Sequence, residues 1–280
     1  MKVYYLGPPG TFGEQAALDY MHRTGLVGEL VPLQSHPEIV AAVDGGADGY
    51  GVVAIENSLG GAVIETMDSI LSSGNVMVRG EHVLAIEQHL IAAPGVGLDS
   101  ITVVMSHPQA LSQCRIFLEK NLPGVRLEAS LSTVAAVEEA VRTSGAAAIA
   151  PQRAAELHGG VILAPNIQDV DNNKTRFLIL GREDAAPTGD DKTSLAFTVP
   201  DKPGAVVSVM QEFSSRGINL TRIESRPSRQ KLGEYVFLLD FQGHRLDPEP
   251  AAALKAITED IGASLLPAGR PLGSYPRFAG

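Results

Sequence analysis

Residues 3–20 read VYYLGPPGTFGEQAALDY: a short apolar run, a turn rich in glycine and proline, and a segment whose apolar residues recur at helical spacing. A strand that leads directly into a helix in this way is typical of an α/β fold. The turn at 7–14 could hold an anion on its backbone N–H groups, or it could be only a tight connection. It matches neither the GxGxxG nor the Walker A pattern, so it does not predict a nucleotide site.

The same strand–turn–helix pattern repeats as far as residue 182, which predicts an open α/β architecture. Strands are expected at 3–6, 51–55, 101–105, 127–130, 146–150 and 175–180, and helices are expected to begin near residues 13, 37, 61, 108, 132 and 151. The segment 75–94 is apolar and rich in β-forming residues, so it predicts one or two long strands that link two lobes.

A smaller domain is predicted after an acidic linker. Residues 183–192 read EDAAPTGDDK, a polar stretch broken by proline and glycine. The pattern beyond it predicts a strand at 193–199, a helix at 204–216, strands at 218–226 and 234–242, a helix at 249–261 and a strand at 263–266. This βαββαβ order is that of a ferredoxin-like fold. The predicted domains are therefore 1–182 and 193–280.

Charge and composition exclude several classes of protein. The net charge is −10 and there is no basic run, so nucleic acid is not an expected partner. Residues 1–192 carry 12 basic and 23 acidic side chains, and residues 193–280 carry 10 and 9, as expected for two different domains. One cysteine excludes an internal disulfide and fits a reducing, cytoplasmic compartment. No apolar run approaches the ~18 residues that a membrane span needs, and the N-terminal segment lacks the pattern of a secretion signal.

Neutral polar residues follow four of the predicted strands. They are Thr11, Asn57, Ser58, Ser106, Gln109, Ser132 and Thr133. In open α/β folds the carboxyl ends of the strands meet at one edge, where small molecules bind. Any single hydroxyl of this set could be only a helix cap, but four such junctions predict a pocket built from dipoles. Arg176 is the candidate cation, because its planar fork can clamp a carboxylate, although its spacing alone favours a solvated strand start.

Two other kinds of site are not predicted. The seven histidines form no HxH or HExxH pattern, so no metal is expected. The GxSxG elbow of a serine hydrolase is missing. Cys114 lies within a predicted helix and is expected to be a small core residue rather than a nucleophile.

Five motifs resemble, in order, those of the prephenate dehydratase family: GPPGTFGEQAA (7–17), AIENSLGG (54–61), SHPQALSQC (106–114), STVAA (132–136) and NIQDVDNNKTRF (166–177). Three more resemble the ACT domain that follows in that family: GAV (204–206), INLTRIESRP (218–227) and EYVFLLDFQGH (234–244). The 280 residues contain no chorismate mutase helix bundle ahead of these motifs, so we expect the monofunctional enzyme. Ala54 stands where the family has proline, and residues 158–160 read HGG where it has Tyr-Gly-Leu, but neither change falls on a side chain assigned to chemistry.

The resemblance implies a catalytic region with two lobes, similar to type-2 periplasmic binding proteins, in which the chain crosses between lobes near 75–79 and 166–172. It also implies that prephenate loses water and CO2 to give phenylpyruvate without a cofactor, because aromatisation drives the reaction. Thr175 is the family's essential residue by motif position, and we expect it to donate a hydrogen bond to the leaving C4 hydroxyl. Arg176 would clamp a carboxylate, with Phe177 and the polar residues above completing the substrate site.

The ACT domain implies feedback by phenylalanine and assembly as a homodimer or a dimer of dimers. The expected phenylalanine contacts are Gly204, Ala205, Val206, Asn219, Leu220, Glu224, Ser225, Arg226 and Pro227. The small Gly-Ala turn would let backbone N–H groups approach the carboxylate of the amino acid.

Two alternatives stay open. A cytoplasmic amino-acid-binding regulator would share the fold without the chemistry, although the TRF motif argues against it. An arogenate dehydratase would use the same groups on a substrate with an amino group in place of the keto oxygen. An assay with both substrates separates these three functions.

Overall fold

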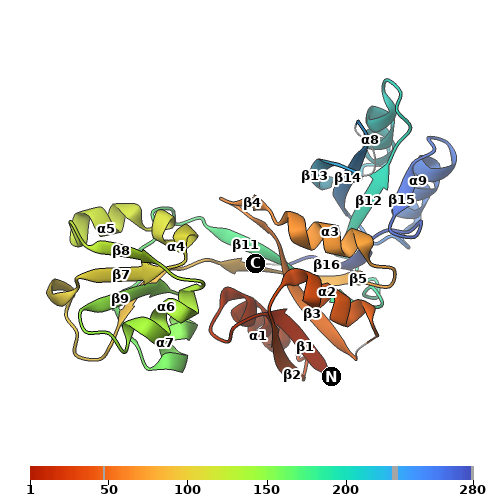
Figure 1. Ribbon diagram of the computed structural model, residues 1–280. Coiled ribbons are helices and arrows are strands. Elements are labelled where there is room, and N and C mark those ends of the chain that lie inside the picture. Colours follow the sequence, from red (N-terminus) through yellow and green to blue (C-terminus); the bar gives the residue numbers. More distant parts are fainter. Residues whose placement is uncertain (47, 229–232, 279–280) are drawn as a thin grey trace. The chain divides into compact units, whose positions relative to one another are not determined.

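The computed structural model describes residues 1–46, 48–228 and 233–278 (Figure 1). Its contacts divide the chain into two compact units. The first comprises Met1–His36, Ala54–Val63 and Val83–Phe177, and the second comprises Pro37–Val53, Ile64–His82 and Leu178–Gly280. Because these units interleave along the chain, the domain bounds given above stay a prediction.

The first sheet has the strand order β2-β1-β3-β11-β5, with β4 paired to β3. Its strands are β1 (Lys2–Leu6), β2 (Glu29–Leu33), β3 (Gly49–Asn57), β4 (Gly61–Ala62), β5 (Met77–Ala85) and β11 (Lys174–Gly181). Three helices follow its strands in sequence: α1 (Phe12–Thr24), α2 (His36–Asp44) and α3 (Ile64–Ser72). The predicted segment 75–94 forms two strands, β5 and β6 (His89–Ala92), that belong to different sheets.

The second sheet has helices on both faces, and its central strand shows why. The sheet has the order β10-β6-β9-β7-β8, with β7 (Val103–Ser106), β8 (Arg126–Ala129), β9 (Ala146–Ala150) and β10 (Val161–Ala164). Strand β9 reads AAAIA and is fully buried, so its side chains alternate between two apolar clusters. One cluster includes residues of α6 (Thr133–Ala140) and α7 (Gln152–His158), and the other includes residues of α4 (Pro108–Gln113) and α5 (Arg115–Asn121). Figure 1 shows these two pairs of helices on opposite faces of the sheet.

The third sheet has the order β13-β14-β12-β15 and carries the predicted βαββαβ arrangement. Its elements are β12 (Asp191–Thr198), α8 (Ala205–Ser215), β13 (Leu220–Pro227), β14 (Tyr235–Gln242), α9 (Pro248–Glu259) and β15 (Ser264–Leu266). A further strand, β16 (Gly273–Pro276), pairs with the first half of β12 and was not expected from the sequence. The α/β class and the ferredoxin-like order are confirmed.

Strands β2 and β10 were not predicted, and the helix predicted to begin near residue 108 is divided into α4 and α5. Two further local features differ from the predictions. The helix expected near residue 61 begins at Ile64, because Gly61 and Ala62 form β4 against the end of β3. The acidic stretch at 183–192 is held by contacts at several points: Asp184 pairs with Arg245, and Asp191 is buried and accepts hydrogen bonds from Thr188. The stretch therefore joins its neighbours through fixed contacts, and β12 begins within it.

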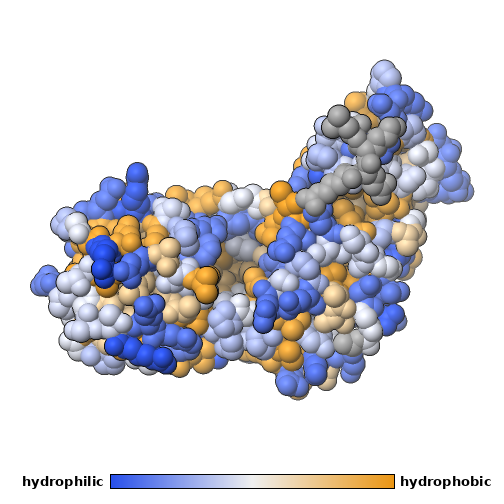
Figure 2. All heavy atoms as spheres, in the orientation of Figure 1, coloured by the Kyte–Doolittle hydropathy of each residue, from blue (hydrophilic) through white to orange (hydrophobic). Residues whose placement is uncertain are grey.

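The visible surface mixes hydrophilic residues with scattered apolar ones (Figure 2). Among the described residues, none of the helices combines the length and the apolar character that a membrane crossing requires.

Candidate active site

Ser58 connects the end of β3 to the start of β11 through three hydrogen bonds. The Ser58 backbone N–H donates to the Lys174 carbonyl (2.8 Å), and its hydroxyl donates to the Asn172 carbonyl (2.9 Å). The same hydroxyl accepts from the Lys174 N–H (2.9 Å). Ser58 therefore fixes the two strand ends, which brings Asn57 against Thr175.

Asn57 holds the Thr175 hydroxyl in a defined orientation. Its Oδ1 accepts from the backbone N–H groups of Leu59 (3.0 Å) and Gly60 (2.7 Å), so its amide nitrogen must point the other way. That nitrogen donates to Thr175 Oγ1 (2.9 Å) and to Asn173 Oδ1 (2.8 Å). Since the Thr175 oxygen accepts from Asn57, its own hydrogen remains available to be donated. Thr175 can therefore act as a hydrogen-bond donor to a bound molecule.

Amide side chains extend this site toward α4. Asn173 is 1% exposed, and its Nδ2 donates to Gln113 Oε1 (3.3 Å). Gln109 lies four residues before Gln113, so both occupy one face of the helix, and Gln109 Nε2 lies beside Gly60. We name Asn57, Gln109, Gln113, Asn173 and Thr175 the amide cluster. A cavity of about 200 Å³ next to it is lined by Leu59, Ser112, Gln113, Gln168, Asp169, Val170 and Asn173.

Asn173 and Gln113 are not among the site residues that the sequence predicts. Asn173 lies within the quoted NNKTRF motif, two residues before Thr175, and this proximity was a usable signal. Gln113 lies one helical turn after Gln109, and its role could be inferred only once the fold had placed α4 beside β11.

Arg176 does not share a face with Thr175. Successive side chains of a strand point to opposite faces, and Arg176 Nη1 pairs with Glu56 Oε1 (3.1 Å), just as Thr175 pairs with Asn57. Arg176 is 8% exposed, and Phe177 is 4% exposed. The prediction that Arg176 joins Thr175 in clamping a carboxylate does not fit this alternation, and Phe177 is placed as a core residue.

The hydroxyl groups of the other predicted site residues form hydrogen bonds within the protein. Ser106 is fully buried and donates to the Ile149 carbonyl (2.6 Å), which corrects its predicted role as a substrate contact. Ser132 caps α6 by accepting from the Ala135 N–H (3.0 Å), with Thr133 as the first residue of that helix. Thr11 caps α1 and donates to the Leu6 carbonyl (2.8 Å).

The turn at 7–14 does contain an anion, but the protein supplies it. Glu14 Oε2 accepts from the Gly10 N–H (2.7 Å), and the Glu14 side chain is only 7% exposed. Arg153 Nε lies 3.4 Å from the same oxygen. Burial, with the Glu14 charge as the second cause, raises the pKa of Tyr5 to about 12. Of the two interpretations of this turn, the structure supports the tight connection, because a carboxylate already occupies its free N–H group.

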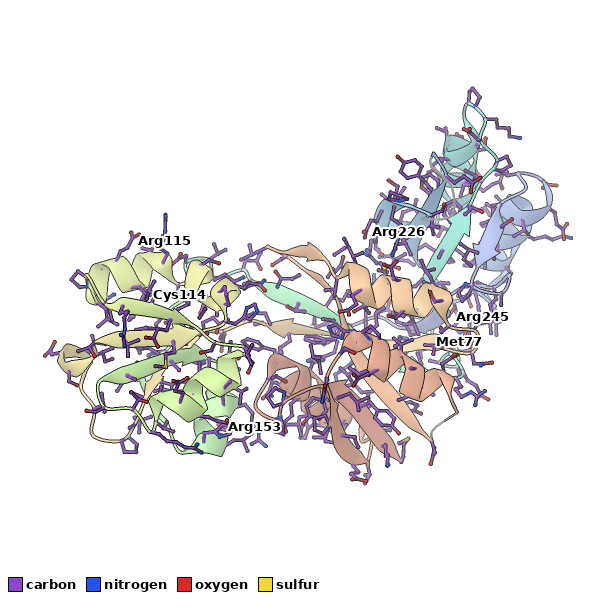
Figure 3. All side chains as sticks on the ribbon, in the orientation of Figure 1. Met77, Cys114, Arg115, Arg153, Arg226 and Arg245 are labelled. Atoms are coloured by element: carbon purple, nitrogen blue, oxygen red, sulfur yellow. The ribbon has the colours of Figure 1, made fainter. Side chains whose placement is uncertain are left out.

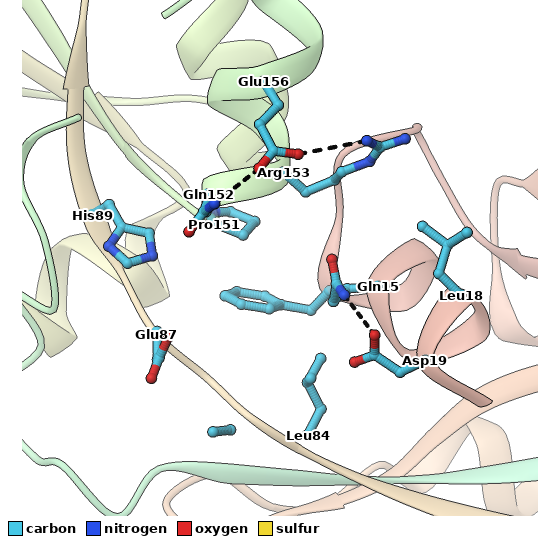
Figure 4. A pocket seen from close by; sticks show the side chains of 12 residues that line it. Gln15, Leu18, Asp19, Leu84, Glu87, His89, Pro151, Gln152, Arg153 and Glu156 are labelled. Atoms are coloured by element: carbon cyan, nitrogen blue, oxygen red, sulfur yellow. Dashed lines mark hydrogen bonds and ion pairs between the residues drawn. The ribbon is translucent and has the colours of Figure 1, made fainter. Parts of the chain in front are cut away.

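A larger cavity of about 530 Å³ lies between α1, α7 and the β5–β6 connection (Figure 4). Its polar wall contains the pairs Gln15–Asp19 (2.7 Å) and Gln152–Glu156 (2.8 Å). His89 Nδ1 accepts from the Asn166 N–H (3.2 Å), and burial lowers the pKa of His89, although the charge of Glu87 opposes this shift. Thr175 does not line this cavity, so we centre the candidate site on the amide cluster instead.

Cys114 belongs to the core, as predicted. It lies at the junction of α4 and α5, where it is fully buried (Figure 3). Burial is the main cause that raises the pKa of its thiol to about 12, which leaves little thiolate at neutral pH.

The predicted effector residues divide into two groups. Ala205 and Val206, which follow Gly204 at the start of α8, line a cavity of about 510 Å³ together with the end of β12 and the start of β14. The remaining residues, 219–220 and 224–227, lie outside it, on or next to β13, the edge strand of the third sheet.

Two side chains of that second group have other partners. Glu224 pairs with Arg222, and Arg226 pairs with Asp68 of α3 (Figure 3). Within the single chain the Arg226 guanidinium is directed to a carboxylate of another element, and its contact with phenylalanine stays a prediction.

The comparisons with known proteins agree with these features. A family model described as prephenate dehydratase matches residues 3–185, and one described as ACT domain matches residues 193–259. The chain is 42% identical over 277 residues to a bifunctional chorismate mutase/prephenate dehydratase of Aquifex aeolicus. The matched residues cover 99% of this chain and 74% of that protein.

Solved structures extend this agreement to three dimensions. A prephenate dehydratase of Arthrobacter aurescens in complex with L-Phe superposes with a TM-score of 0.85 at 34% identity, covering 99% of this chain and 90% of that one. A protein described as a quorum-quenching acylase superposes with a TM-score of 0.86 at 28% identity, covering 100% and 99%. The family model alone spans well over half of the chain. This chain belongs to the prephenate dehydratase family and carries an ACT domain.

Proposed function

We propose that this protein converts prephenate to phenylpyruvate with loss of water and CO2, a step of phenylalanine biosynthesis. Family membership supports this activity, and one observation in the site carries it: the hydrogen bond from Asn57 Nδ2 to Thr175 Oγ1 (2.9 Å). It leaves a positioned O–H group beside a set of neutral amides. A cytoplasmic location fits the single buried cysteine.

The Thr175 hydroxyl donates a hydrogen bond to the hydroxyl group that leaves the substrate. As the bond between ring carbon C4 and its oxygen breaks, negative charge develops on the oxygen, and a fixed O–H donor stabilises it. A threonine hydroxyl is a poor acid near neutral pH, so it contributes a hydrogen bond rather than a full proton transfer. The electrons of the breaking bond between the ring and its carboxylate complete the aromatic ring as CO2 leaves.

We propose that neutral side chains bind the carboxylates of the substrate. Gln109, next to Gly60, is proposed to contact the pyruvyl carboxylate, with Thr133, the first residue of α6, as a further candidate. Arg176 is proposed to join β11 to β3 through Glu56 rather than to clamp a carboxylate. A cluster without a strong cation near the ring carboxylate does not stabilise its charge, which favours its loss as CO2.

Phenylalanine is proposed to regulate the enzyme through the ACT domain. The L-Phe in the Arthrobacter aurescens relative supports this effector. Ala205 and Val206 line the cavity of one chain, while Asn219, Leu220 and Ser225 lie outside it on the side of the edge strand β13. We propose that β13 of a second copy completes the effector site, so that the protein acts as a homodimer or a dimer of dimers.

The test compares the wild-type protein with Thr175→Ala and Thr175→Ser, using prephenate and arogenate as separate substrates. Phenylpyruvate is measured by its absorbance in alkali, and phenylalanine from arogenate is measured by chromatography. We expect prephenate turnover in the wild type, a fall in kcat of ~10²–10³ in Thr175→Ala, and substantial recovery in Thr175→Ser, which restores the hydroxyl. A wild-type protein that turns over neither substrate would leave the amino-acid-binding regulator as its function. Preferential use of arogenate would assign the arogenate reaction.

A further inference from the structure

The last described residues of the chain, 270–278, form a segment that we name the C-terminal strap. It lies beyond the ACT family match, which ends at residue 259. Its central strand β16 pairs antiparallel with β12, from Asp191 opposite Pro276 to Ser194 opposite Gly273. The strap is therefore fixed to the strand whose other end, at Thr198, lines the proposed effector cavity.

The strap also lies directly against β5. The Val78 N–H donates to the Leu272 carbonyl (2.9 Å), and a Cβ atom added to Gly273 would collide with the Val78 carbonyl oxygen. Gly273 has a φ of 151°, which other residues rarely adopt. This contact between two backbones therefore depends on glycine at position 273.

Side chains reinforce the contact between the strap and β5. Glu81 of β5 has a side chain only 3% exposed, and both of its oxygens accept from Lys192 Nζ of β12 (2.8 and 2.9 Å). The Phe278 N–H donates to the same carboxylate (3.0 Å), and the Phe278 ring meets His82 edge-on at 5.1 Å between centroids. Strand β5 is thus tied to β12 both directly and through the strap.

Strand β5 leads from these contacts toward the amide cluster. It ends at Ala85, and the next N–H group, that of Ile86, donates to the Asn173 carbonyl (2.8 Å). Asn173 Oδ1 accepts from the Asn57 nitrogen that also orients Thr175. A displacement of β5 would therefore act on the group that positions the Thr175 hydroxyl.

We propose that the C-terminal strap couples the effector cavity of the ACT domain to the amide cluster through β5. This inference rests on the proposed function, because it assigns a route to its regulation. An effector alters activity only if it binds two states of the protein with different affinity. The strap and β5 would be the element whose position differs between those states.

Gly273→Ala is the decisive variant, because its methyl group would displace the strap from Val78. Gly269→Ala is the matched control: Gly269 also has a positive φ (71°), but a Cβ there meets nothing within 4 Å. Alanine is unfavourable at the positive φ of both positions, but only Gly273→Ala would break the contact between the strap and Val78. For each full-length protein we would measure kcat/KM for prephenate with and without saturating phenylalanine, and phenylalanine affinity by calorimetry.

We expect phenylalanine to lower kcat/KM by ~5–150-fold in the wild type and in Gly269→Ala, the usual range of such coupling, and by less than ~5-fold in Gly273→Ala. Phenylalanine should still bind all three proteins. Phe278→Ala is a milder second variant for the case that Gly273→Ala does not fold, and it too should weaken inhibition. Wild-type inhibition in both strap variants would overturn the route while leaving the proposed function intact. A wild-type enzyme that phenylalanine does not inhibit would overturn the proposed regulation itself, and the route with it.

Discussion

At the scale of single residues, the orientation of one amide decides the chemistry of the site. Two backbone N–H groups hold Asn57 Oδ1, so its nitrogen faces Thr175. If the amide were reversed, its oxygen would accept the Thr175 hydrogen and the hydroxyl could no longer donate to a substrate. The donor property of Thr175 is therefore set by Leu59 and Gly60, through groups that take no part in the reaction.

Asn57→Asp tests this orientation with almost no change in size. An acceptor oxygen would then face Thr175 Oγ1, so the threonine would donate to the carboxylate instead of to the leaving hydroxyl. We expect kcat to fall by ~10²–10³, comparable with the loss of one transition-state donor, while the unfolding midpoint changes little. Asn172→Asp adds the same charge at an exposed neighbouring position and serves as the control. Equal activity of the two variants would contradict the role given to Asn57.

At the scale of elements, α2 begins with a buried histidine. His36 is 8% exposed, and among the residues that the structure describes its Nδ1 has no hydrogen-bond partner. Burial lowers the pKa of His36 from 6.5 to about 4. The folded protein therefore favours the neutral ring, and its protonation opposes the folded state.

The resulting pH dependence has a definite sign. Because the pKa in the folded state lies below the ordinary value, the contribution of His36 to stability is complete above pH 6.5 and is lost as the pH falls toward 4. A shift of this size corresponds to a loss of about 3 kcal/mol in the free energy of unfolding. Urea unfolding at pH 7 and pH 4.5 should show a smaller acid-induced loss in His36→Gln than in the wild type. His22→Gln, at an exposed position, should behave like the wild type, and an identical loss in all three proteins would contradict the assignment.

At the scale of the whole molecule, ion pairs join segments that are far apart in the sequence. Asp68 of α3 and Arg226 of β13 belong to the same compact unit, and their side chains are 27% and 12% exposed. The interaction links a helix of the first α/β region to the edge strand of the ACT domain. It is separate from the strap, which contacts β5 at Val78 and Glu81.

A double-mutant cycle measures this link. The proteins are the wild type, Asp68→Asn, Arg226→Met and the double variant, each unfolded in urea. We expect a coupling of about 0.5–3 kcal/mol, since residues in direct contact are not additive. The same cycle on Glu212 of α8 and Arg216, the residue that directly follows this helix, gives a reference for a local pair four residues apart. Additive effects of the Asp68 and Arg226 substitutions would show that they do not interact in solution.

Much of this architecture could be predicted because it depends on local sequence patterns. The continuous apolar run of β9, the caps of α1 and α6 and the βαββαβ order each depend on residues close together in the sequence, and they indicated the fold class and most elements. Short motifs such as IENS and TRF indicated the family and Thr175. Strand β16 was missed because its four residues have no periodicity of their own and are held by pairing with β12.

The sequence by itself determined the fold class, the family, and Thr175 and Asn57 as candidate site residues. Only the tertiary structure decided how these residues are used. Strand alternation directs Arg176 to Glu56 and away from Thr175, and Ser106 is placed where its hydroxyl bonds to Ile149. The physical reason is that the partner of a polar group is set by distance and direction in space. Residues 57 and 175 form a hydrogen bond although 117 others separate them in the chain, and no local pattern encodes that bond.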